Sequence, residues 1–219
     1  MEPTPVLIMG AAGRDFHNFN VRFREDKTRK VVAFTATQIP YINDRKYPAS
    51  LAGPLYPEGI KIFDESKLVE LMEEFKVKEV YFSYSDVPYK YLMNRAAIVE
   101  AHGADFILVS AESVMIKSKK PVIAVTAVRT GCGKSQTTRH IGKILLERGL
   151  KVAAIRHPMP YGDLAAQRCQ RYSCIEDLHK HKCTIEEMEE YEPHIKDGIL
   201  VYAGVTTRTS WNLLRLKLM

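Results

Sequence analysis

The chain has 219 residues, of which 46% are hydrophobic and 26% charged, and it contains seven histidines. These values are typical of a folded globular protein and exclude a disordered, collagenous or coiled-coil chain. No segment approaches the roughly 18 apolar residues of a membrane helix, and the first five residues lack the features of a secretory signal. We therefore expect a cytoplasmic protein with no membrane partner.

The net charge of +6 is modest, and the aromatic residues form no basic stacking platform. Nucleic acid is therefore not an expected partner. The cysteines form no CxxC pair, and together with His179 and His181 their spacing fits no zinc finger. We expect reduced, structural thiols rather than metal ligands at all four positions: Cys132, Cys169, Cys174 and Cys183.

The first half alternates short apolar runs with helical patterns, which is typical of a parallel α/β sheet. Phenylalanines at 16, 19 and 23 predict a short helix, and residues 40–59 form a long loop rich in Pro, Gly and Tyr. This pattern predicts a Rossmann-like domain over residues 1–117. The expected strands are 6–9, 31–35, 60–63, 79–83 and 105–109, and the longer expected helices are 66–75 and 88–102.

A basic run at 117–120 predicts a linker, after which a second α/β pattern begins. It predicts the first part of a P-loop NTPase domain over residues 118–205, followed by a divergent tail at 206–219. Its expected elements are a strand at 122–126, a helix ending near 148, a strand at 151–156, a helical region at 163–196 and a strand at 199–203.

The strongest chemical signal is Gly131-Cys132-Gly133-Lys134-Ser135, which lies between the first of these strands and the helix. Glycines let the backbone N–H groups turn toward phosphate oxygens, and the start of a helix adds a favourable dipole. Lys134 is expected to reach the β- and γ-phosphates, and the Ser135 hydroxyl to hold Mg²⁺.

The usual first glycine of the motif is replaced by Val128, but Arg129 suits a variant that supplies a second cation. The sequence does not distinguish ATP from GTP, because it contains no NKxD element. The expected nucleotide-binding residues are Thr130, Gly131, Cys132, Gly133, Lys134, Ser135 and Gln136.

Several ordered motifs resemble the cyclic 2,3-diphosphoglycerate synthetase family, also described as predicted GTPases. They span about residues 5 to 205, and family members are roughly twice as long. We therefore expect this chain to correspond to an N-terminal half. The resembling segments are 10–20, 34–40, 51–57, 129–137, 156–163 and 181–187.

The resemblance implies an ATP-dependent ring closure that joins the two phosphates of 2,3-diphosphoglycerate. In this interpretation Lys134 and Arg129 act on the nucleotide, and Asp163 binds magnesium or orients a nucleophile. An equally open interpretation gives Arg156, His157 and Asp163 only loop-stabilising contacts, and the glycine loop at 10–13 is about as well explained by a close-packed turn without a ligand. The expected substrate-binding residues are Gly10, Gly13, Arg14, His17, Arg156 and His157.

Two other functions stay open. One is a GTPase-type switch or assembly factor, and the other is a non-catalytic protein that retains phosphate binding. A homo-oligomer is also possible, because the last expected strand, 199–203, is a candidate sheet edge. The acidic run from Glu186 to Glu192 is most simply a solvated helix face.

Overall fold

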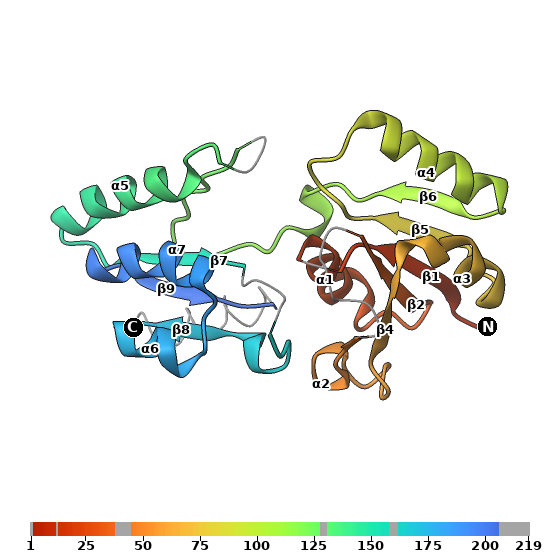
Figure 1. Ribbon diagram of the computed structural model, residues 1–219, viewed down its shortest axis with the longest axis horizontal. Helices are drawn as coiled ribbons and strands as arrows, with labels where there is room; N and C mark the ends of the chain where they lie inside the picture. Colours follow the sequence, from red (N-terminus) through yellow and green to blue (C-terminus); the bar gives the residue numbers. More distant parts are fainter. Residues whose placement is uncertain (1, 12, 38–44, 128–130, 158–161, 206–219) are drawn as a thin grey trace. The chain divides into compact units, whose positions relative to one another are not determined.

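A computed structural model describes residues 2–11, 13–37, 45–127, 131–157 and 162–205. The chain forms two compact units, Met1–Ile116 and Lys117–Met219, which we call unit 1 and unit 2. Each unit has its own sheet, coloured red to yellow-green and green to blue in Figure 1. The α/β fold class expected from the sequence is therefore confirmed.

Unit 1 contains a six-stranded sheet in the order β3-β4-β2-β1-β5-β6. Every described pair is parallel except β3 with β4. Strand β1 lies between β2, the next strand of the chain, and β5, a later strand. The carboxyl ends of β1 and β5 therefore mark a switch point of the strand order. The strands are β1 (Thr4–Met9), β2 (Arg29–Ala36), β3 (Lys46–Tyr47), β4 (Ile60–Asp64), β5 (Glu79–Phe82) and β6 (Asp105–Leu108).

Alternating side chains of β1 face two different layers, as the period of a strand requires. Leu7 and Met9 pack with buried residues of α3 (Leu68–Glu74) and α4 (Tyr89–Ala101). The opposite layer is aromatic. Its rings come from the helical segment after β1, from β2 and from β3: Phe16, Phe19, Phe34 and Tyr47.

The segment after β1 consists of α1 (Arg14–Asn18) and a turn of π-helix (Phe19–Phe23). The expectation of a long loop at 40–59 is wrong for its described part, which contains β3 and the short helix α2 (Ala49–Ala52). Two further single turns are 3-10 helices, Glu65–Lys67 and Glu112–Val114.

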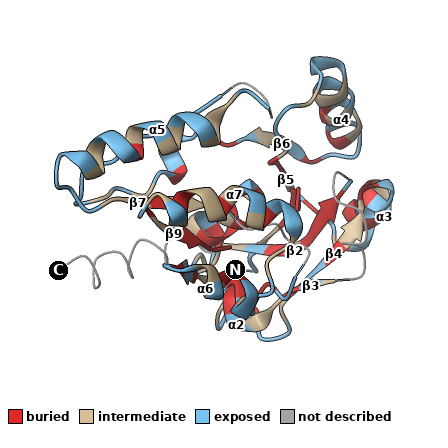
Figure 2. Ribbon diagram, turned by 60° about the vertical axis from the view of Figure 1, so that its left-hand side comes forward, coloured by how far each residue is buried: buried red, intermediate tan, exposed pale blue. Residues whose placement is uncertain are grey.

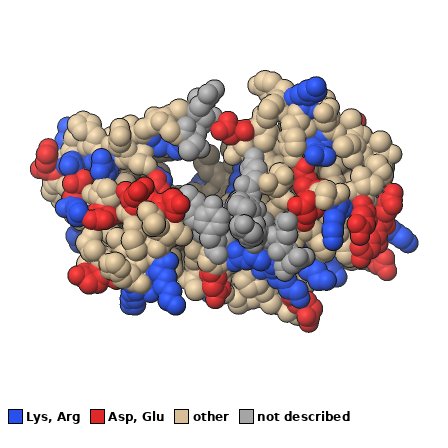
Figure 3. Space-filling model, in the orientation of Figure 1, with Lys and Arg blue, Asp and Glu red and all other residues tan. Residues whose placement is uncertain are grey.

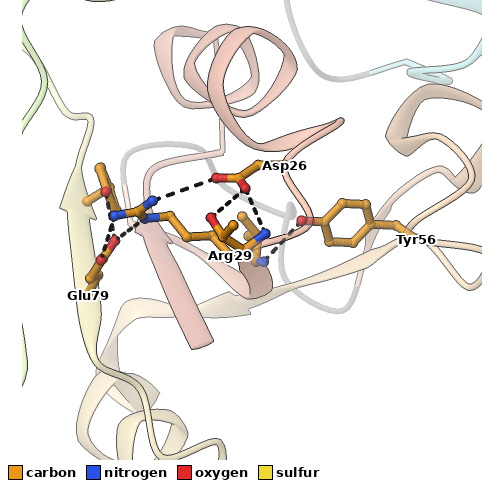
Figure 4. A network of polar contacts seen from close by, with 7 residues as sticks. Asp26, Arg29, Tyr56 and Glu79 are labelled. Carbon is orange, nitrogen blue, oxygen red and sulfur yellow. Dashed lines mark hydrogen bonds and ion pairs between the residues drawn. The ribbon is translucent and has the colours of Figure 1, made fainter. Parts of the chain in front are cut away.

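A polar network ties the amino-terminal ends of the strands together (Figure 4). Arg29 of β2 donates two hydrogen bonds to Glu79 of β5, at 2.8 and 3.1 Å, across the strand that lies between them. Burial alone raises the pKa of Glu79, but the bonds from Arg29 and Tyr81 outweigh it and the pKa lies below its usual value. This network is far along the strands from the carboxyl ends, so we interpret it as structural.

Unit 2 contains a three-stranded sheet in the order β7-β9-β8, in which β9 is central. β9 is parallel to β7 and antiparallel to β8. The core of unit 2 is formed by Tyr172, Tyr191 and Val201 together with other buried apolar residues. The elements are α5 (Lys134–Glu147), β7 (Ala153–Arg156), a 3-10 turn (Ala166–Arg168), β8 (Gln170–Tyr172), α6 (Ile175–Lys180), α7 (Ile185–Lys196) and β9 (Leu200–Ala203).

Three expectations for unit 2 are wrong. Residues 122–126 form no regular element, and Val122 and Ile123 are 56% and 58% exposed. This apolar run pairs with none of the strands of the sheet, which contains only β7, β9 and β8 among the described residues. The expected helical region at 163–196 contains β8 as well as helices, and the expected edge at 199–203 is the centre of the sheet.

Helix α5 is the least buried long element of unit 2 (Figure 2). Gly142 is its one buried residue, and a side chain added there would meet the end of Ile199. Basic and acidic side chains are interspersed over both units on the face shown in Figure 3. None of the described helices has the length and apolarity needed to cross a membrane.

Candidate functional site

Two glycines with left-handed backbone conformations precede the start of α5. Gly131 and Gly133 both have φ of 81°, in the left-handed region that favours glycine. Space is open where a Cβ would stand at either residue. The helix begins at Lys134, and Gly133 at its N-cap has no side chain to bind the first N–H groups. These N–H groups and the helix dipole together suit an anion.

Ser135, in the first turn of α5, contacts a residue that sequence reasoning did not select. Its Oγ donates a hydrogen bond to Oε1 of Glu190 at 2.8 Å. Glu190 lies on α7, 55 residues further along the chain. The pairing brings a carboxylate to the hydroxyl that was expected to hold Mg²⁺.

Arg156 ends β7 and forms an ion pair with the same oxygen of Glu190. The side chains of Arg156 and Glu190 are 21% and 25% exposed, so both charges are largely withdrawn from water. His157 follows directly and is exposed. The structure therefore brings Ser135 and Arg156 together through Glu190.

His194 lies one turn after Glu190 on α7 and is 1% exposed. Its Nδ1 is 2.9 Å from the backbone oxygen of Glu190, which accepts the hydrogen bond. Burial, together with the positive charges of Arg156 and Arg139, lowers the pKa of His194 to about 4. His194 is therefore neutral at neutral pH.

Two other expected site residues, Arg129 and Thr130, lie outside the described residues, as does the turn at 158–161. Asp163 is described and exposed. Its side chain accepts the N–H of Ala165 at 2.8 Å and starts the 3-10 turn that follows. This contact gives Asp163 a structural task, and its expected catalytic role stays a prediction.

The cysteines and histidines do not converge. The Cys183 thiol donates to the Tyr172 hydroxyl at 3.4 Å, and Cys174 is the N-cap of α6. Among the residues that the structure describes, no group of three or more His, Cys, Asp or Glu side chains is arranged to hold a metal ion.

The glycine loop of unit 1 is closed by a protein carboxylate. Asp15 is 3% exposed, and its Oδ1 accepts the N–H groups of Gly13 at 3.0 Å and Phe16 at 2.6 Å. A Cβ on Gly10, where φ is 128°, would lie 2.7 Å from Oδ2 of Asp15. Asp15 therefore occupies the N–H groups that an anionic ligand of this loop would use.

Arg14 and His17, expected to bind substrate, both contact backbone oxygens of the segment that follows β6. Arg14 donates to the oxygen of Val109 at 3.0 Å, and Nε2 of His17 donates to the oxygen of Val114 at 2.8 Å. These contacts attach α1 to that segment. Whether either residue also binds a substrate stays a prediction.

Other buried polar side chains gather where the parallel strands of unit 1 end. Asn18 donates to the Ser83 hydroxyl at 3.0 Å, just after β5, and Thr35 lies near the end of β2. Glu65 follows β4, accepts a hydrogen bond from Tyr91 and forms an ion pair with Arg95. Within the described part of the chain, buried oxygens here that have no hydrogen-bond partner are Asn18 Oδ1, Thr35 Oγ1 and Glu65 Oε2, and the ion-paired Arg95 Nε has none either.

Sequence reasoning missed Glu190 because it interpreted the acidic run as a solvated face. That interpretation is wrong for two of its members. Glu187 is 5% exposed and forms a capping box with Thr184, and Glu190 contacts Ser135. The T-x-x-E pattern at 184–187 was a usable signal for the start of α7, and Glu190 follows one helical turn later.

No protein-family model matches the chain. It is 58% identical over 200 residues to a protein named arginine synthetase ArcE from Thermococcus kodakarensis. The match covers 91% of this chain and 45% of that protein, so the chain spans less than half the length of this relative. The relative's name differs from the cyclic 2,3-diphosphoglycerate synthetase family that the motifs resemble, although both names describe a synthetase.

Proposed function

We propose that unit 2 binds a nucleoside triphosphate with Mg²⁺, and that the chain is the nucleotide-binding part of a synthetase. The observation that carries the proposal is the pair of left-handed glycines directly before Lys134, with Ser135 hydrogen-bonded to a carboxylate. The oxygen atoms at this point suit Mg²⁺, because Mg²⁺ prefers oxygen ligands and makes few protein contacts besides those to the phosphates. The printed name of the relative supports a synthetase.

Each residue has a distinct task in this proposal. The backbone N–H groups at the start of α5 and the ammonium group of Lys134 bind the phosphates and neutralise charge that builds up during phosphoryl transfer. Ser135 contributes its hydroxyl oxygen to Mg²⁺, and Arg156 presents a guanidinium at the end of β7. Mg²⁺, when bound, adds charge neutralisation between the phosphates.

Two substrate classes fit a synthetase of this kind. In cyclisation of 2,3-diphosphoglycerate, the γ-phosphoryl group activates one substrate phosphate and the second displaces inorganic phosphate. For a product such as arginine, the γ-phosphoryl group activates the oxygen of a ureido group, and ammonia then displaces inorganic phosphate to form the guanidino group. The identity with a protein named arginine synthetase favours the second class over the first.

We assign the second reactant to the carboxyl ends of the unit 1 strands, where open α/β sheets bind ligands. The support is the group of unpartnered buried atoms at Asn18, Thr35 and Glu65. Asn18 Oδ1 and Glu65 Oε2 can only accept, which suits a ligand rich in N–H groups better than a phosphate, and the Thr35 hydroxyl can accept or donate. Calorimetry with arginine and with 2,3-diphosphoglycerate tests this, and a Thr35→Val variant that binds either compound as the wild type does would contradict it.

The nucleotide proposal predicts that Lys134→Ala weakens triphosphate binding at least tenfold, about 1.4 kcal/mol, because the cation that pairs with the phosphates is removed. Calorimetric titration of the full chain with ATP and with GTP, each with Mg²⁺, measures the loss. Lys143→Ala is the matched control, since Lys143 is on the same helix and pairs with Asp197 at 3.0 Å.

Unchanged affinity in Lys134→Ala would contradict the proposal. Nucleotide turnover with candidate substrates then distinguishes the alternatives. Binding of GTP alone without a product supports a GTPase-type switch, and binding without turnover supports a non-catalytic protein.

A further inference from the structure

Glu190 lies beside the hydroxyl that the proposed nucleotide site requires. Oγ of Ser135 is 2.8 Å from Oε1 of Glu190, and Arg156 is paired with the same oxygen. The three residues come from the start of α5, the middle of α7 and the end of β7. Their side chains therefore meet only in the folded unit.

Packing of α7 directs Glu190 toward this point. The helix starts at a capping box between Thr184 and Glu187, and its buried face continues through Tyr191 and His194. Glu190 is three residues after Glu187 and four before His194, so it lies on the same side of the helix. The remaining glutamates of the run face elsewhere, as Glu189 is exposed and Glu192 pairs with Lys196.

The hydrogen bond between Ser135 and Glu190 leaves the serine oxygen suited to a cation. A hydroxyl has one hydrogen to donate and two lone pairs. Since the hydrogen is donated to Glu190, both lone pairs of Oγ point away from the carboxylate and are available to a metal ion. A carboxylate that accepts this bond also makes the oxygen a stronger ligand.

We propose that Glu190 is the acidic positioning residue of the Mg²⁺ site. It orients the Ser135 hydroxyl and supplies negative charge in the outer ligand shell of the ion that accompanies the triphosphate. This inference rests on the proposed nucleotide function. It assigns this acidic role to a residue of a helix, α7.

Arg156 completes the arrangement. Its pairing with Glu190 compensates a carboxylate that is only 25% exposed. A guanidinium has five N–H donors, so one edge holds Glu190 while others remain for phosphate oxygens. Glu190 thereby places Arg156 as well as Ser135.

The test compares nucleotide affinity with Mg²⁺ and with EDTA in the full chain, using the better-bound of ATP and GTP. The readout is the dissociation constant in EDTA divided by that with Mg²⁺, so a larger ratio means a stronger dependence on Mg²⁺. Glu190→Gln keeps the shape of the side chain and removes its charge, and we expect the ratio to fall at least fivefold. Glu189→Gln on the same helix is the control and keeps the wild-type ratio.

Ser135→Ala supplies a second measurement if Glu190→Gln folds poorly, as judged by circular dichroism. It removes the hydroxyl that Glu190 orients, so the same loss of Mg²⁺ dependence is expected. If the two residues act as one unit, the double variant loses little more than either single variant.

Wild-type Mg²⁺ dependence in folded Glu190→Gln overturns the inference and leaves the nucleotide proposal intact. An equal loss of affinity in EDTA and in Mg²⁺ also overturns it, because a residue that only maintains the loop affects both titrations alike. Failure of the wild-type chain to bind ATP or GTP overturns both proposals, and that result is seen before any Glu190 variant is made.

Discussion

Two glycine-rich loops of similar sequence have different surroundings at the scale of single residues. At Gly131 and Gly133 a Cβ would stand in open space, whereas Gly10 is pressed against Asp15. The N–H groups of the first loop meet no capping side chain at Gly133, but those of the second are bound by the Asp15 carboxylate. Of the described parts of these two loops, the one at the start of α5 has more room for a ligand, and its binding of phosphate stays a prediction.

Gly10→Ala tests this difference in unit 1. The new Cβ would lie 2.7 Å from the Asp15 carboxylate and φ is 128°, so both contact and backbone strain oppose it. We expect a loss of about 2–3 kcal/mol in the free energy of unfolding. Urea denaturation followed by circular dichroism measures it.

Gly103→Ala is the matched control for this prediction. Gly103 has φ of 74° with open space around it, so only the strain of about 1 kcal/mol applies. Equal losses in the two variants would show that contact with Asp15 contributes nothing.

At the scale of secondary structure, α7 connects stability with the candidate site. Its buried face carries His194 into the interior, and the next polar residue on that side, Glu190, contacts Ser135. Tyr191 lies in the core beside Tyr172, with ring centroids 5.0 Å apart. Packing of this helix therefore fixes the position of the carboxylate.

Acid is expected to destabilise unit 2 through His194. Its pKa is about 4 in the folded chain, below the ordinary value of 6.5, because it is buried and faces Arg156 and Arg139. The unfolded chain thus takes up a proton first as the pH falls. The contribution of neutral His194 to the free energy of unfolding is fully present above pH 6.5 and is lost between pH 6.5 and pH 4. About 2 kcal/mol of it is lost at pH 5.

Urea denaturation at pH 7.5 and pH 5 measures this loss in the wild type and in His194→Gln, which should show less of it. His102→Gln is the control, because Nδ1 of His102 makes the same contact with a backbone oxygen four residues earlier, at 2.8 Å, but on an exposed helix end. A pH dependence that persists unchanged in His194→Gln would assign it to other groups.

At the scale of the whole molecule, the two units have separate cores. Leu7 and Val80 belong to the core of unit 1, and Tyr172 and Val201 to that of unit 2. Substitutions in one core therefore act on one unit. The chain also spans only 45% of the length of its relative, so the activity of the whole protein is a proposal.

We expect calorimetry to show two unfolding transitions, one for each core. Leu7→Ala removes a fully buried side chain from unit 1 and should cost about 3 kcal/mol there. It should lower the midpoint of one transition and leave the other in place. A single transition that shifts as a whole would mean that the units unfold cooperatively.

Local patterns of the sequence were sufficient for the α/β class and for five of the six strands of unit 1, and they predicted the glycines before α5, whose role as a phosphate loop stays a prediction. Alternation, glycines and helix starts act over a few neighbouring residues, so they are readable without a fold. The Ser135–Glu190–Arg156 cluster was not readable, because its members are joined by packing of α5, α7 and β7. The same applies to residues 122–126, since whether an apolar run joins a sheet depends on pairing with strands that are distant in the sequence.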